Sequence, residues 1–135
     1  MTNNRIHPPA LFDTSGFGFS HIAIQSGGRT AHIAGQTAWD KDRNLVGGND
    51  VALQTRQTLA NLRDALTAVG ATPADIVRLR TYVVNPDENT LMAVVGEIAA
   101  FYGDAVPAPN TFLAIAGLAM PEFLVEIEAT AALPD

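Results

Sequence analysis

Alternating apolar and polar positions predict two neighbouring strands early in the chain, over residues 17–25 and 29–39. The segment Ser26-Gly27-Gly28 lies between them and is typical of a tight turn. We therefore expect the two strands to pair as a β-hairpin. Residues 1–15 show no period and are rich in turn-forming residues, which indicates an extended lead-in.

A first helix is predicted where apolar residues recur at spacings of three and four, between Leu59 and Val69. Asn49 or Asp50 can cap its start, because either side chain can accept the free N–H groups of the first turn. Gly70 is expected to end it in a left-handed conformation.

A second helix is predicted to bury one apolar face between Leu91 and Phe101, including Val94, Val95 and Ile98. The segment Asn85-Pro86-Asp87-Glu88 resembles a capping box that opens it, with Asn85 as the cap. Gly103 is expected to stop it.

Three further strands are expected, over residues 76–84, 111–118 and 123–133. In the first, Val77, Leu79, Thr81 and Val83 alternate with Arg78, Arg80 and Tyr82, whereas residues 111–118 are apolar on both sides. The order of elements predicts an α+β fold in which two helices cover one face of a single sheet. The second face is expected to be apolar and to require a neighbouring subunit.

Length and charge narrow the class of protein. The 135 residues fit one domain, 1–135, and the net charge is −6, from eight Lys and Arg against fourteen Asp and Glu. No nucleic-acid partner is expected, since such binding depends on clustered basic residues. The absence of a long apolar stretch predicts a soluble, cytoplasmic protein without a membrane partner.

The chain lacks the residues or spacings that several common catalytic chemistries need. The chain has no cysteine, and His7, His21 and His32 lack the spacing of a metal site, so no metal is expected. Ser20 and His21 are sequence neighbours that point to opposite sides of a strand, which is the wrong geometry for a nucleophile and its base.

Several short segments, in order and spread over the chain, resemble the Rid family (reactive intermediate/imine deaminase, YjgF-like), often labelled endoribonuclease L-PSP. They are Ile33-Ala34-Gly35-Gln36, Gln54-Thr55, Asn61-Leu62, Gly70, Asp75-Ile76-Val77, Phe101-Tyr102 and the segment from Pro121 to Ala129. The resemblance implies a chorismate-mutase-like fold and a homotrimer with a central barrel and clefts between adjacent subunits. It further implies hydrolysis of small enamines and imines to a carbonyl compound and ammonia, without a cofactor.

The resemblance also assigns a candidate site. The family's catalytic glutamate corresponds to Glu126, and the arginine that holds the substrate carboxylate corresponds to Asn110, followed by Thr111. The remaining substrate-binding positions correspond to Phe19, Ala34, Gly35 and Gln36.

Asn110 departs from the family pattern in a way that affects the substrate. A guanidinium offers two parallel donors to a carboxylate, whereas an amide offers a neutral donor. We therefore expect either a hydrolase with a non-standard, neutral or hydroxylated substrate, or a small-molecule-binding or regulatory trimer without turnover. Substitution of the missing arginine by Arg78 or Arg80 stays open, beside the alternative that both are cross-strand charge partners.

Overall fold

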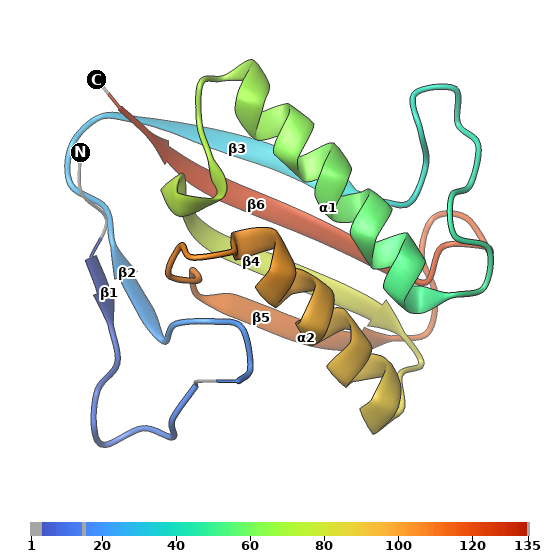
Figure 1. Ribbon diagram of the computed structural model, residues 1–135, viewed down its shortest axis with the longest axis horizontal. Coiled ribbons are helices and arrows are strands. Elements are labelled where there is room, and N and C mark those ends of the chain that lie inside the picture. Colours follow the sequence, from blue (N-terminus) through green and yellow to red (C-terminus); the bar gives the residue numbers. More distant parts are fainter. Residues whose placement is uncertain (1–3, 15, 135) are drawn as a thin grey trace.

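The computed structural model describes residues 4–14 and 16–134 and has an α+β architecture (Figure 1). The elements are β1 Asn4–Ile6, β2 Ile22–Ile24, β3 Arg29–Gln36, α1 Val51–Ala68, β4 Ile76–Val84, α2 Glu88–Tyr102, β5 Asn110–Ile115 and β6 Val125–Leu133, with a 3-10 turn at Pro73–Asp75. Four strands form one mixed sheet in the order β3-β6-β4-β5, in which β4 and β5 are parallel and the other pairs antiparallel. Strands β1 and β2 form a separate pair.

Both helices lie on the same face of the four-stranded sheet, as the sequence predicts (Figure 1). The core between the layers joins fully buried residues of each helix, such as Leu62 and Ile98, to alternate positions of the central strands, such as Leu79 and Ile127. Within the described part of the chain, neither helix is long and apolar enough to cross a membrane.

The helix ends follow local hydrogen bonding. The Asp50 side chain caps α1 by accepting from the backbone N–H groups of Ala52 and Leu53, and Gly70 follows the helix at a φ of 74°, both as predicted. The predicted cap of α2 is wrong. The cap is Asp87 instead of Asn85, because the Asp87 carboxylate accepts from the Thr90 N–H at 2.7 Å.

The predicted hairpin is also wrong. Strand β2 pairs with β1 in the lead-in segment, and the described partner of β3 is β6. The Arg5 guanidinium donates to the Ile76 carbonyl at 2.6 Å, and the Ser20 N–H donates to the Ala108 carbonyl at 3.2 Å. These long-range bonds hold the N-terminal segment beside the starts of β4 and β5 (Figure 1).

A β-bulge changes which residues of β4 reach the core. The register shifts between Ile76 and Arg78, so that Ile76 is fully buried and Val77, predicted to face inward, is only half-buried. From Leu79 onward the predicted alternation holds.

The sheet face away from the helices is more polar than predicted. Its central positions include Arg80, Tyr82, Glu126 and Glu128, and Leu113 lies on the edge strand β5. Exposed large apolar residues are instead frequent in the N-terminal segment, namely Ile6, Leu11, Phe12, Phe17, Ile22 and Ile24.

Two amide side chains of α1 tie loops to the sheet. Gln54 is fully buried, donates to the carbonyls of Gly48 and Glu122, and accepts from the Leu124 N–H. Asn61 donates to the carbonyls of Thr37 and Trp39. Both residues belong to segments that carry the family resemblance, and their hydrogen bonds serve the fold.

Candidate functional site

Glu126 and Gly35 are in close contact across neighbouring strands. Glu126 lies on β6, on the sheet face away from the helices, and Gly35 lies where the register between β3 and β6 shifts. A Cβ atom on Gly35 would lie 2.8 Å from the Glu126 carboxyl carbon, closer than real Cβ contacts allow. The absence of a side chain at Gly35 therefore creates the space that the Glu126 carboxylate occupies.

The charge of Glu126 is disfavoured by its surroundings. Partial burial raises the pKa of the Glu126 carboxyl above its ordinary value, and the negative charge of Glu128, two residues along the same face, raises it further. A carboxyl with a raised pKa keeps its proton to a higher pH than an ordinary glutamate does.

Among the described residues, Glu128 has side-chain partners and Glu126 has none. The Tyr82 hydroxyl donates a hydrogen bond to Glu128, and this bond raises the pKa of Tyr82. The Arg80 guanidinium lies 4.0 Å from the other Glu128 oxygen. Arg80 is thus a cross-strand charge partner, as one of the two sequence-based alternatives predicts. The two carboxyls therefore have different environments: the Glu128 carboxyl is held by Tyr82 and Arg80, and the Glu126 carboxyl is not.

The other residues expected on β3 lie beside this pair. Gln36 donates through Nε2 to the Ala34 carbonyl at 3.0 Å, and the Ala34 side chain is exposed. Gly35 and Gln36 line a cavity of about 550 Å³ together with Trp39, Lys41 and other residues of the following loop and α1. Glu126 is not part of the lining of that cavity.

Three further predicted residues meet in a second cavity, of about 450 Å³. Phe19, Asn110 and Thr111 line it with Arg78 of β4 and His21. The Asn110 oxygen accepts from the hydroxyl of buried Thr81 at 3.1 Å, and the Asn110 Nδ2 atom is enclosed without a hydrogen-bond partner in the described chain. Arg78 and Asn110 thus line the same cavity, Arg78 from the outer face of β4 and Asn110 from the helix side of β5.

Within one chain the two groups are separate. Glu126 pairs with Tyr82, and Tyr82 pairs with Leu113, three residues along β5 from Asn110. The Cα atoms of Glu126 and Asn110 are therefore about 14 Å apart. Their side chains also leave opposite faces, since Asn110 contacts Thr81 on the helix side. Neither the cavity of about 450 Å³ nor the cavity of about 550 Å³ is lined by both residues.

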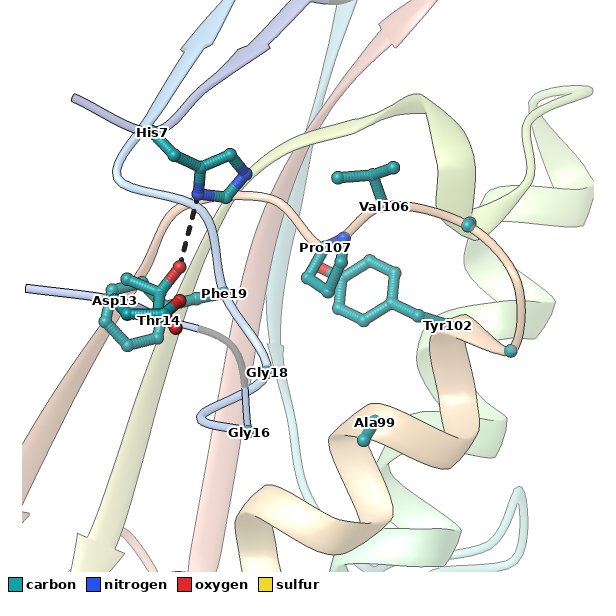
Figure 2. Close-up of a pocket in the computed structure, with 12 residues that line it drawn as sticks. His7, Asp13, Thr14, Gly16, Gly18, Phe19, Ala99, Tyr102, Val106 and Pro107 are labelled. Atoms are coloured by element: carbon teal, nitrogen blue, oxygen red, sulfur yellow. Dashed lines mark hydrogen bonds between the residues drawn. The ribbon is translucent and has the colours of Figure 1, made fainter. Parts of the chain in front are cut away.

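A third cavity, of about 510 Å³, lies between the N-terminal segment and the end of α2 (Figure 2). His7 and Thr14 face each other in its lining, with 3.3 Å between Nδ1 and the hydroxyl, and Phe19 lines this cavity too. Ser20 lies 3.5 Å from His7 Nε2, but it is fully buried and donates to the Pro107 carbonyl. The Ser20 hydroxyl therefore holds the N-terminal segment to the loop before β5.

Some of the site is visible only in the structure. Arg78 and Tyr82 carry a weak signal in the sequence, because alternation places them on the polar side of their strand. Their partners are long-range, so neither the cavity beside Arg78 nor the bond from Tyr82 to Glu128 follows from local spacing.

Residues 14–133 match the family described as Endoribonuclease L-PSP. A crystal structure of YyfB from Yersinia pestis, a protein of unknown function in the conserved Rid family, is 53% identical; the match covers 98% of this chain and 100% of that one, with a TM-score of 0.95. A Mycobacterium tuberculosis member of the YjgF/YER057c/UK114 family is 31% identical, with coverage of 98% and 100% and a TM-score of 0.65. RidA from an Antarctic Psychrobacter is 22% identical, with coverage of 82% and 85% and a TM-score of 0.68, a likeness of fold alone.

Proposed function

Because the chain belongs to the endoribonuclease L-PSP family, also called the Rid or YjgF family, we propose that it hydrolyses small enamines or imines to a carbonyl compound and ammonia. The observation that carries the proposal is the close contact between Gly35 and Glu126. It leaves a carboxyl group with a raised pKa on an otherwise uncovered face of the sheet.

In the proposed reaction, Glu126 acts as a general base and then as a general acid. The Glu126 carboxylate takes a proton from water while the water oxygen bonds to the imine carbon. The protonated carboxyl then returns that proton to the nitrogen of the resulting carbinolamine. The Glu126 carboxylate then takes the hydroxyl proton and passes it to the amino nitrogen, so that the carbon–nitrogen bond breaks, the carbonyl forms and neutral ammonia leaves. An enamine first tautomerises to the imine, taking a proton at carbon and losing one from nitrogen.

The proposed site lies between subunits of a homotrimer. Two of its parts, Glu126 with Gly35 and the cavity beside Asn110, are separate within one chain. A cleft between adjacent copies would join the first part of one copy to the second part of the next, as in a heterologous, ring-closing interface. Light scattering tests the assembly, and the mass of a monomer would contradict it.

The substrate is proposed to be non-standard for the family because Asn110 replaces the carboxylate-binding arginine. Purified protein would be mixed with imines generated in the assay by an amino-acid oxidase, and release of the carbonyl compound would be followed against buffer. The Glu126→Gln variant, which cannot act as the base, should fall to the buffer rate. Equal rates with and without wild-type protein, for acidic and neutral imines alike, would exclude the activity.

A second function, a small-molecule-binding or regulatory trimer without turnover, is favoured by the same replacement. An amide at position 110 can bind a neutral ligand without activating an imine. Ligand-dependent shifts in the thermal unfolding midpoint, without product release, would distinguish this function from hydrolysis.

A further inference from the structure

The side chains of Glu126 and Glu128 leave β6 on the same face of the sheet and turn toward different neighbouring strands. The Glu126 carboxyl lies over Gly35 of β3, where a Cβ atom would be 2.8 Å from its carboxyl carbon. The Glu128 carboxyl lies over β4, where the Tyr82 hydroxyl donates to one oxygen and the Arg80 guanidinium lies 4.0 Å from the other. Because β6 lies between β3 and β4, these contacts draw the two carboxyls apart.

The register of β4 against β6 shows that the bond from Tyr82 is a diagonal one. Tyr82 is directly opposite Glu126, and Arg80 is directly opposite Glu128. Diagonal neighbours on one face of an antiparallel pair are roughly 7 Å apart, within reach of an aromatic side chain. Tyr82 thus gives its hydroxyl group to Glu128, although Glu126 is the residue across from it.

Few charged or titratable groups face Glu126 from the neighbouring strands. On β4 they are Tyr82 and Arg80. Among the described residues of β3 on this face it is His32, which lies opposite a residue of β6 four positions beyond Glu126. On β6 it is Glu128, whose negative charge raises the pKa of Glu126 in addition to the larger effect of burial. The position of the Glu128 charge therefore affects how readily Glu126 ionises.

We propose that Tyr82 is a positioning residue that, together with Arg80, holds the Glu128 carboxylate over β4 and leaves the Glu126 carboxyl free to take a proton from water. The assignment rests on the proposed function, in which Glu126 is the base. The donated hydrogen bond offsets part of the Glu128 charge and fixes its distance from Glu126. Without this bond the repulsion between the two carboxylates should increase, so that Glu126 holds its proton to a higher pH.

Tyr82→Phe is the direct test, because it removes the hydroxyl and keeps the ring. The raised pKa of Tyr82 keeps this hydroxyl protonated near neutral pH, so the substitution changes no charge there. The carboxyl carbon of Glu126 would be followed by ¹³C NMR as a function of pH, with Glu126→Gln used to assign its signal. Tyr82→Phe should raise the pKa of Glu126. On the acidic limb of the kcat/KM profile, hydrolysis should be about threefold slower, with little change on the plateau.

The same substitution in a Glu128→Gln background shows whether Tyr82 acts through Glu128. Glu128→Gln alone should lower the pKa of Glu126. Adding Tyr82→Phe should then change nothing, since the charge that the hydroxyl holds is gone. The assignment would be overturned by an effect of Tyr82→Phe that persists in Glu128→Gln, or by a Glu126 pKa that Tyr82→Phe alone leaves unchanged or lowers.

Tyr102→Phe is the matched control, because it removes the same atom from a tyrosine at the end of α2. The Tyr102 hydroxyl accepts from the Ala108 N–H and lies on the helix side of the sheet. Its loss should leave the pKa of Glu126 as in the wild type, even where it lowers stability. A shift as large as that of Tyr82→Phe would show that loosening of the fold, and not the position of Glu128, moves this pKa.

The two proposals can fail separately, because the NMR titration requires no turnover. A Glu126 pKa that rises in Tyr82→Phe through Glu128, without hydrolysis of any imine, supports the positioning of Glu128 and removes the enzymatic function. Hydrolysis of imines with an acidic limb that Tyr82→Phe does not move supports the enzyme and overturns the role of Tyr82.

Discussion

A methyl group on Gly35 would lie 2.8 Å from the carboxyl carbon of Glu126. The backbones of β3 and β6 are fixed by their hydrogen-bond ladder on the N-terminal side of this contact, so the strands cannot simply move apart. The carboxylate thus occupies space that exists because residue 35 has no side chain. Loss of that space should displace the carboxylate before it harms the fold, since the end of a glutamate side chain can rotate away.

Gly35→Ala should separate function from stability. The added methyl group should move the Glu126 carboxylate away from its position in the site. The rate of imine hydrolysis should then fall by about tenfold or more, because part of the contribution of general acid–base catalysis is lost. The unfolding free energy should change by less than about 1 kcal/mol, because the clash is with a flexible side chain. Assays of hydrolysis and of urea unfolding check the two parts.

Gly96→Ala is the control for this change. Gly96 lies within α2, and a Cβ atom there would meet nothing within 4 Å. Alanine should stabilise the helix by about 0.5–1 kcal/mol and leave hydrolysis unchanged. If Gly35→Ala were as active as Gly96→Ala, the close contact with Glu126 would have no role in the site.

Glu128→Gln should shift the pH dependence of hydrolysis. Burial is the larger cause of the raised Glu126 pKa, and the negative charge of Glu128 raises this pKa further. Loss of the Glu128 charge should therefore lower the Glu126 pKa. Because the proposed base must be ionised, the acidic limb of the kcat/KM profile should move to lower pH. Glu122→Gln is the control, because Glu122 is not among the charges that raise the Glu126 pKa, and it should leave the acidic limb of the profile in place. A limb that moves to higher pH in Glu128→Gln would contradict the electrostatic account.

The same raised pKa predicts how the stability of Glu126→Gln depends on pH. When the pKa of an acid is higher in the folded state, the unfolded chain loses its proton first as pH rises. The wild type therefore loses stability between the unfolded and folded pKa values, and the neutral glutamine does not. Urea unfolding at about pH 3.5 and about pH 7 should show Glu126→Gln gaining stability relative to wild type at the higher pH. The opposite trend would mean that the charge of Glu126 is favoured in the fold.

Gln54→Ala should be strongly destabilising although Gln54 lies outside the proposed site. The change leaves the carbonyls of Gly48 and Glu122 and the N–H of Leu124 without their partner in a buried place. We expect a loss of about 2–4 kcal/mol in the unfolding free energy. Gln57→Ala, one turn along and half-buried, should cost less than about 1 kcal/mol. Equal losses would show that the buried amide bonds contribute little.

What the sequence predicts correctly is mostly local or periodic. The helical spacing, the Asp50 cap and the strand alternation of β6 each depend on residues within a few positions of one another. They also place the predicted residues Gly35 and Glu126 on two strands that turn out to be neighbours. Which strands pair with each other, in contrast, depends on residues that are far apart in the sequence.

The predictions that are wrong depend on distant contacts. The turn Ser26-Gly27-Gly28 favours a hairpin, but the bonds from Arg5 and Ser20 to later strands favour pairing of β2 with β1. The bulge before Arg78 and the bond from Thr81 to Asn110 likewise involve other strands. No local spacing encodes them, and they decide which arginine lines the cavity.

The central claim is that Glu126 of one copy and the cavity beside Asn110 of the next copy form one hydrolytic site. Two variants that each disable one part, Glu126→Gln and the cavity-filling Thr111→Trp, would be assayed separately and after mixed assembly in equal amounts. In randomly mixed ring-shaped oligomers, roughly one quarter of the clefts combine two intact parts. We predict that the mixture recovers about a quarter of the wild-type rate of imine hydrolysis, whereas a mixture as inactive as either variant alone would contradict the shared site.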